Sequence, residues 1–122
     1  MTSRAITIDT LEPTIAEGGI VLLDFWAAWC GPCRMFAPTF ERAAAQHPDI
    51  VFGKVDTEAE QELAAAAGIR SIQTLMAFRD GVLVFAQPGA LPAESLEELV
   101  TAVRGLDMDS VRAELAEQRR TA

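Results

Sequence analysis

The feature that most constrains this fold is a near-continuous apolar run, Ile20–Trp26, which stands directly before two cysteines. A short run of this kind is typical of a parallel strand that is buried on both faces. The alanine-rich stretch that follows, from about Cys33 to Gln46, predicts a helix, which Pro38 should bend or break. Cys30 and Cys33 are therefore expected at a strand-to-helix turn.

The rest of the chain alternates between short strand patterns and helical patterns. Asp80-Gly81 between two apolar runs is a strong hairpin signal. Parallel pairs need helical crossovers, whereas this hairpin adds an antiparallel edge. We therefore expect an α/β fold with a mixed central sheet of about five strands, helices on both faces and an extra C-terminal helix. The predicted strands are about 5–8, 20–26, 50–56, 74–79 and 82–86, and the predicted helices about 10–17, 33–46, 58–67, 92–104 and 111–120.

Length and charge limit both the organisation and the partners. Of the 122 residues, half are apolar, which predicts one domain with its own core, residues 1–106, followed by a C-terminal helical extension, 107–122. The net charge of −8, from 10 basic and 18 acidic residues, argues against nucleic acid or an anionic membrane as the partner. We expect a cytoplasmic monomer, because we find no signal-peptide pattern, no membrane-length apolar run and no clear dimer seam.

The cysteine pair is the candidate for chemistry, since two cysteines do not make a disulfide scaffold. Their spacing at the start of a helix predicts Cα atoms about 5 Å apart, within the range of a disulfide. Unpaired N–H groups and the helix dipole should favour a thiolate at Cys30, with Cys33 more buried and less reactive. We therefore predict that Cys30 attacks a substrate disulfide and Cys33 resolves the mixed disulfide, with Gly31 and Pro32 keeping the turn tight.

A metal site is the first alternative, because half of a zinc site has the same cysteine spacing. A structural zinc site needs four ligands, however, and the chain contains two cysteines and one histidine. His47 lies in a polar stretch and is expected to be solvated. We therefore predict no metal ion.

Two further residues have more than one interpretation. Asp24, inside the apolar run, is either a satisfied buried carboxyl group or a proton acceptor for the resolving cysteine, because burial raises the pKa of a carboxyl group. Lys54, in the next predicted strand, is either its charge partner or a surface lysine. Trp29, beside the cysteines, is either docking surface or core.

The stretch Asp24–Met35, DFWAAWCGPCRM, resembles the active-site signature of the thioredoxin family. The resemblance covers roughly residues 5–105, and it continues through Ala37-Pro38, Lys54-Val55-Asp56, Gly68-Ile69-Arg70, Thr74-Leu75, Phe78, Gly81 and Gly89-Ala90-Leu91. It implies a thioredoxin fold and a protein-disulfide reductase that works through its own cysteine pair, with no bound cofactor. It also implies two kinds of partner, disulfide-containing client proteins and a flavoprotein thioredoxin reductase fed by NADPH.

The resemblance also assigns roles to single residues. Cys30 resembles the family's nucleophile, Cys33 its resolving cysteine, Asp24 its buried acid and Lys54 the lysine beside that acid. The apolar rim on which substrates lie in the family is matched by Trp29, Gly31, Pro32, Ile72, Gly89 and Ala90.

Gln73 is the main departure, because the family has a cis-proline at this rim position. A cis bond costs about 3–4 kcal/mol before a non-proline residue, against about 0.5–1 kcal/mol before proline. We therefore predict a trans Ile72–Gln73 bond and a rearranged loop, with substrate binding affected more than thiol chemistry. The alternative function is a protein-binding module with impaired redox turnover. Two chains sharing a metal cluster through four thiolates is a lesser alternative.

The second departure is the tail after Gly105. It is interpreted either as a packed or frayed terminal helix or as a helix that binds a partner.

Overall fold

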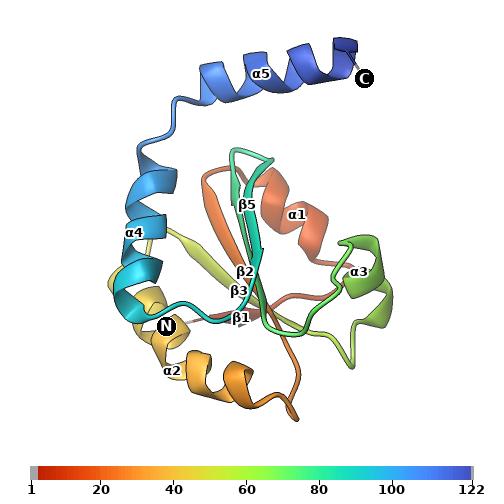
Figure 1. Ribbon diagram of the computed structural model, residues 1–122, viewed down its shortest axis with the longest axis vertical. Coiled ribbons are helices and arrows are strands. Elements are labelled where there is room, and N and C mark those ends of the chain that lie inside the picture. Colours follow the sequence, from red (N-terminus) through yellow and green to blue (C-terminus); the bar gives the residue numbers. More distant parts are fainter. Residues whose placement is uncertain (1–2, 122) are drawn as a thin grey trace.

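A computed structural model describes residues 3–121, in which helices and strands alternate around one sheet (Figure 1). Residues 1–2 and 122, at the ends of the two predicted ranges, lie outside this description. The strands are β1 (Arg4–Ala5), β2 (Ile20–Trp26), β3 (Val51–Asp56), β4 (Thr74–Arg79) and β5 (Val82–Pro88). The helices are α1 (Leu11–Ala16), α2 (Gly31–Gln46), α3 (Gln61–Ala66), α4 (Ala93–Arg104) and α5 (Met108–Thr121).

The strands form a mixed sheet with the order β1-β3-β2-β4-β5, which confirms the predicted architecture. β3 pairs in parallel with β1 and β2, while β4 is antiparallel to both β2 and β5. β4 and β5 are joined at Asp80 and Gly81, whose φ angles of 50° and 83° are both left-handed. A tight hairpin turn of this kind needs positive φ at two successive residues, which explains the predictive value of the Asp-Gly pair.

Hydrophobic clusters on the two faces of the sheet explain why β2 is apolar along its length. Successive side chains of a strand point to opposite faces. Leu22 packs in one cluster with residues of α2 and α4, whereas Leu23 and Phe25 pack in the other with Leu63 of α3. Asp24 shares its face with Leu22, so its carboxyl group points to the side of α2 and the cysteines.

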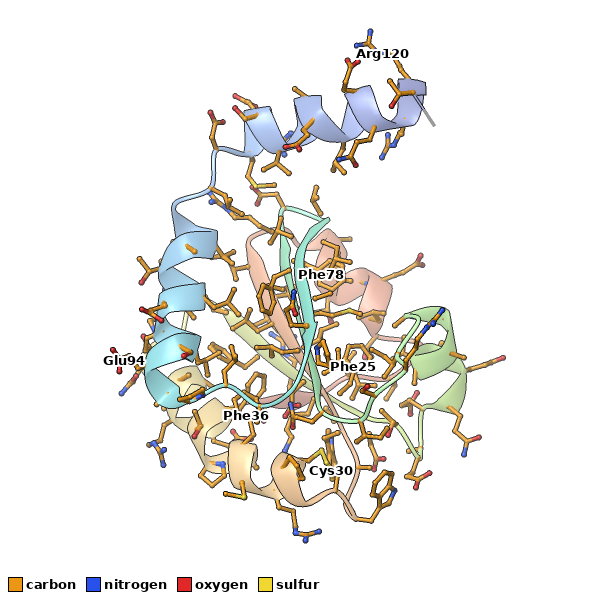
Figure 2. The ribbon with its side chains drawn as sticks, viewed as in Figure 1. Phe25, Cys30, Phe36, Phe78, Glu94 and Arg120 are labelled. Atoms are coloured by element: carbon orange, nitrogen blue, oxygen red, sulfur yellow. A yellow bond between two sulfur atoms is a disulfide. The ribbon has the colours of Figure 1, made fainter. Side chains whose placement is uncertain are left out.

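Helix α2 begins at Gly31, two residues earlier than predicted, and runs without a break through Pro38. Its buried side chains include Phe36 and Phe40, which hold it against the sheet. The ring of Phe40 lies 5.7 Å from that of Phe36 and 5.2 Å from that of Phe52 on β3. Figure 2 shows Phe36 inside the body and Cys30 at one end of the molecule. This packing fixes the N-terminus of α2 over the end of β2.

The loop after α2 differs from the prediction, because His47 is not solvated. Its side chain is only 18% exposed, with Nε2 2.8 Å from Oε1 of Glu97 and Nδ1 3.1 Å from a guanidinium nitrogen of Arg104. The reason is tertiary, since α4 packs beside α2 and brings both partners to the histidine. No helix described within residues 3–121 has the length and apolar character needed to cross a membrane.

Helix α5 is longer than predicted and runs across the end of the molecule opposite Cys30 (Figures 1 and 2). It begins early because the Asp107 side chain accepts the backbone N–H groups of Asp109 and Ser110. Of its described residues, Met108 alone is buried. The tail is therefore a formed helix attached to the body mainly through its first turn.

Candidate active site

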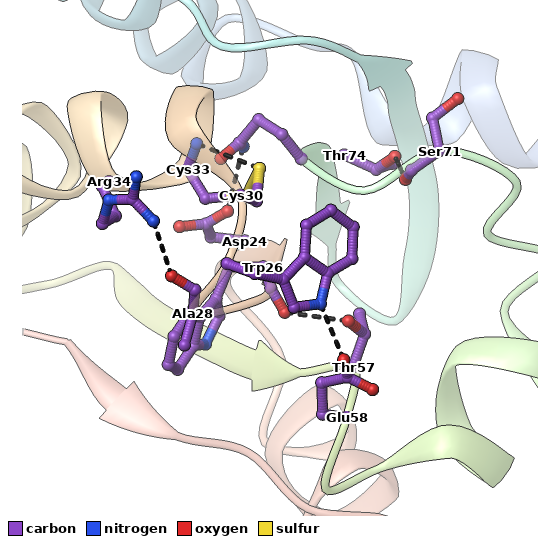
Figure 3. Close-up of a disulfide and its surroundings, with 12 residues drawn as sticks. Asp24, Trp26, Ala28, Cys30, Cys33, Arg34, Thr57, Glu58, Ser71 and Thr74 are labelled. Carbon is purple, nitrogen blue, oxygen red and sulfur yellow. Dashed lines mark hydrogen bonds between the residues drawn. A yellow bond between two sulfur atoms is a disulfide. The ribbon is translucent and has the colours of Figure 1, made fainter.

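Cys30 and Cys33 form a disulfide at the start of α2, with Cα atoms 5.2 Å apart, close to the predicted separation (Figure 3). Cys30 is the N-cap residue, with extended backbone, and its Sγ accepts the backbone N–H of Cys33 at 3.2 Å. Pro32 lies in the first turn, where its missing N–H removes no helix bond. Both cysteines are buried, with exposures of 6% for Cys30 and 3% for Cys33. The predicted difference in their reactivity therefore depends on their positions in the helix and not on burial.

Asp24 is completely buried and lies next to the two cysteines (Figure 3). Burial raises the pKa of its carboxyl group from 3.8 to about 6, although a hydrogen bond from Gln73 and the charge of Lys54 act in the opposite direction. The charge of Glu41 on α2 adds to the increase. A carboxyl group with this pKa can hold or release a proton near neutral pH, as predicted for the acid behind the pair.

Lys54 lies opposite Asp24 in the register of β2 and β3. Its ammonium group is not within ion-pair distance of an acid among the described residues; Nζ lies 4.8 Å from the centre of the Trp26 ring. A cation over an aromatic face is stabilised by the ring electrons. Lys54 therefore acts on Asp24 through its field and not through a direct contact.

Gln73 is the site residue whose placement sequence reasoning missed. The Ile72–Gln73 bond is trans, as predicted, but Gln73 has a left-handed φ of 66°. Its side chain turns inward, only 1% exposed, and Nε2 donates a hydrogen bond to Oδ1 of Asp24 at 3.0 Å. Its backbone groups also form hydrogen bonds. The N–H of Gln73 donates to the carbonyl oxygen of Phe25, and its carbonyl oxygen accepts from the N–H of Gly89. The Gln73 side chain is thus part of the buried acid site, whereas Ile72 before it is partly exposed.

An exposed apolar rim surrounds the disulfide. The Trp29 side chain is 62% exposed, and its indole N–H donates to Oε1 of Glu58 at 2.7 Å (Figure 3). Ile72 is half-buried against the two cysteines. Met35, near the start of α2, is 81% exposed and was not singled out from the sequence. The remaining predicted rim residues are all at least partly exposed: Gly31, Pro32, Gly89 and Ala90.

Among residues 3–121, no cluster of three or more His, Cys, Asp and Glu side chains is arranged to hold a metal ion. The site consists instead of a disulfide at a helix N-terminus, with a buried acid behind it and apolar surface around it. This arrangement, on a mixed sheet with helices on both faces, defines a thiol–disulfide exchange domain.

Comparison with known proteins gives the family. The family model described as thioredoxin matches residues 4–102, and the chain belongs to that family. It is 54% identical to "Putative thioredoxin 2" of Streptomyces coelicolor, over all of this chain and 92% of that protein. It is 45% identical to a thioredoxin of Bacillus subtilis, over 81% of this chain and 90% of that one.

Solved structures agree with this assignment. A mutant thioredoxin from Halobacterium salinarum superposes with a TM-score of 0.78 at 34% identity, covering 85% of this chain and 91% of its own. Spinach chloroplast thioredoxin F gives the same TM-score at 30% identity, covering 85% and 95%. The fold is therefore the thioredoxin fold, and the protein is a thiol–disulfide oxidoreductase that uses its own cysteine pair. In general terms, the family's partners are disulfide-containing targets and a reductase.

Proposed function

We propose that the protein reduces disulfides in client proteins, with Cys30 as the nucleophile and Cys33 as the resolving cysteine. The observation that carries these roles is the hydrogen bond from the Cys33 N–H to the Cys30 sulfur at the N-terminus of α2. A donor at this distance, together with the helix dipole, stabilises negative charge on sulfur. Cys33 lies one turn further inside the helix, where these effects are weaker.

The exchange conserves atoms and electrons. The Cys30 thiolate attacks one sulfur of the client disulfide, and the other client sulfur leaves as a thiolate. The Cys33 thiol then gives its proton to Asp24 and attacks Cys30, which forms the Cys30–Cys33 disulfide and releases the second client thiolate. A flavoprotein thioredoxin reductase, fed by NADPH, returns two electrons to the pair. Lys54 supports the step through its charge, which favours the ionised acid before the transfer.

Clients are proposed to dock on the rim around the disulfide. Neither backbone group of Ile72 is in a hydrogen bond with another described residue, which leaves both for an extended client segment. Exposed apolar surface at Trp29 supplies the area for binding. The other proposed rim residues are Gly31, Pro32, Gly89 and Ala90, with Gln73 acting from beneath them.

The proposed redox unit is residues 1–106, and 107–122 form an extension to it. The family match ends at residue 102, which supports this division. The Streptomyces relative nevertheless aligns over the whole chain, so the extension is not peculiar to this sequence. We further propose that the protein acts as a monomer in the cytoplasm, where a reducing compartment suits a disulfide reductase.

The test is reduction of insulin disulfides in the presence of NADPH and a thioredoxin reductase. The wild-type protein should turn over, whereas Cys30→Ser should be inactive and Cys33→Ser should stop at a mixed disulfide. Gln73→Pro, run beside them, measures what the departure from the family contributes. Absence of turnover by the wild type would contradict the proposal.

A second candidate function, a binding module with little redox turnover, is favoured by the left-handed Gln73 next to the docking surface. Client binding that persists in the wild type while insulin reduction stays at background would support it. Turnover that needs Cys30 would count against it.

A further inference from the structure

We propose that the carboxamide of Gln73 and the carboxyl group of Asp24 form a closed pair with two hydrogen bonds whenever Asp24 carries a proton, which makes Gln73 a positioning residue for the acid. One of these bonds is present, from Nε2 of Gln73 to Oδ1 of Asp24 at 3.0 Å. The two remaining polar atoms of the same groups, Oδ2 of Asp24 and Oε1 of Gln73, are buried and without a hydrogen-bond partner among the described residues.

The chemistry of these two unpaired atoms explains the second bond. Both are acceptors while Asp24 is ionised, so they cannot bond to each other. A proton on Oδ2 converts that atom into a donor, and the amide oxygen of Gln73 is then its complement. On the edge that each presents to the other, a carboxylic acid and a primary amide offer one donor and one acceptor. Protonation of Asp24 therefore satisfies both buried atoms at once, which matters because unpaired buried polar groups are unfavourable.

The other charged and titratable groups around Asp24 do not take this role. Lys54 on β3 lies opposite it in register, but its ammonium group is over the Trp26 ring. Glu41 on α2 contributes negative charge, which opposes ionisation of Asp24 without supplying a bond to it. The cysteines of α2 are joined in a disulfide. Gln73 is therefore the group that would accept a hydrogen bond from protonated Oδ2 of Asp24.

This pairing has a consequence for exchange that rests on the roles proposed above for Cys33 and Asp24. When the Cys33 thiol gives up its proton, the proton is bound at Oδ2 of Asp24 and donated to Oε1 of Gln73. The Cys33 thiolate then forms its bond to Cys30, and the bond from Cys30 to the client breaks. Gln73 thus keeps both oxygen atoms of Asp24 paired after proton transfer, which offsets the bond that it gives the carboxylate beforehand.

The test is a pH titration of the Asp24 carboxyl carbon by NMR in the oxidised protein, where neither cysteine titrates. The bond from Gln73 to the carboxylate lowers the pKa of Asp24, so its loss alone, in Gln73→Leu, should raise that pKa by about 1 or more. The closed pair adds a second bond that only the protonated acid makes, and two neutral bonds are worth about as much as one bond to a carboxylate. It therefore predicts that the pKa in Gln73→Leu stays within about 0.5 of the wild-type value. The matched control, Gln87→Leu on an exposed residue of β5, should leave that pKa where it is. A pKa raised by about 1 or more in Gln73→Leu would overturn the proposal, because Gln73 would then serve the carboxylate alone.

A second variant keeps the proposal testable if leucine disturbs the loop. Asparagine tolerates the left-handed φ of position 73, but its amide is one methylene too short to bridge to Asp24. Gln73→Asn should therefore also leave the pKa of Asp24 within about 0.5 of the wild-type value, and an increase of about 1 or more would contradict the closed pair. These titrations need neither client nor reductase, so their outcome is separate from that of the insulin assay.

Discussion

Asp24 has no exposed surface, and its ionisation in the folded protein is opposed by burial. Its pKa rises from 3.8 in an unstructured chain to about 6, so the folded state binds the proton more tightly than the unfolded state. The stability that this provides is fully present below about pH 4 and is lost as pH rises through 6. At about 1.4 kcal/mol for each pKa unit, the loss amounts to about 3 kcal/mol.

Asp24→Asn tests the direction in which stability changes with pH. The amide cannot ionise, so the variant should be more stable than the wild type by about 3 kcal/mol near pH 8, and the two should converge near pH 4. Urea denaturation of the oxidised proteins over this pH range measures the difference. Asp109→Asn, at an exposed carboxyl of α5, is the control and should give no such trend. A difference that stays constant with pH would contradict the linkage.

At the level of single residues, the cysteine pair and the acid could be predicted from the sequence, because they lie within ten positions of one another along β2 and α2. The side-chain direction of Gln73 could not. It joins Asp24 across 49 positions, through the pairing of β2 with β4, and its left-handed backbone has no sequence signal in glutamine. A local sequence pattern does not predict a contact between residues that are this far apart in the chain.

At the scale of elements, Arg79 of β4 fixes the C-terminal end of α4. One guanidinium nitrogen donates to the carbonyl oxygens of Val103, Arg104 and Leu106 at 2.7–3.0 Å. The last carbonyl groups of a helix lack their usual N–H partners, and the Val103 oxygen accepts a long bond of 3.4 Å from the Leu106 N–H. A cation there also complements the helix dipole. Arg79 thus holds α4 against the sheet and anchors the start of the tail.

Arg79→Met keeps the apolar stem and removes these bonds. We expect it to lower the free energy of unfolding by at least about 2 kcal/mol, because even one hydrogen bond from a charged donor is worth about 1.5–3 kcal/mol. Urea denaturation at neutral pH measures the loss. Arg112→Met, in an exposed ion pair with Asp109 on α5, should cost less than about 0.5 kcal/mol. Equal losses in the two variants would contradict the stabilising role of the hydrogen bonds from Arg79 to the end of α4.

Gly53 of β3 leaves room for the side chains of Ile6 and Leu23. A Cβ at this position would lie 2.6 Å from Cγ1 of Ile6 and 3.0 Å from Cδ2 of Leu23, both in a packed core. Gly53→Ala should therefore destabilise the protein by about 1–3 kcal/mol through overpacking. The same substitution at Gly105, where the nearest atom is 3.5 Å away, serves as the control and should be close to neutral. Thermal denaturation compares the two, and a stable Gly53→Ala protein would contradict the contact.

Long periodic elements could be predicted better than their ends. The bounds of β2 and β4 agree with the prediction, whereas α3 begins at Gln61 and not at 58. The reason is local, since Asp56 accepts the backbone N–H groups of Glu58 and Ala59 and forms a turn before the helix. The first strand is limited to Arg4–Ala5, because the N–H groups of Thr7 and Ile8 donate to the side chains of Thr10 and Glu60 and not to β3.

At the scale of the whole molecule, α5 lies at the far end from the disulfide and is attached mainly through Met108 (Figure 2). Deletion of residues 111–122 keeps this anchor. It should change the free energy of unfolding by less than about 1 kcal/mol, since mainly exposed or half-buried side chains are lost. Insulin reduction should also be unaffected. A large loss of stability would show that the helix is packed, and a loss of turnover alone would show that it serves a partner.

The proposed chemistry requires the Cys30 sulfur to ionise more readily than that of Cys33, because Cys30 caps the N-terminus of α2. The decisive experiment is alkylation of the fully reduced protein over a series of pH values, mapped to each cysteine by mass spectrometry. We expect rapid modification of Cys30 at neutral pH, with its rate falling only at acidic pH, and slow modification of Cys33 throughout. Two cysteines that react equally slowly at neutral pH would contradict it.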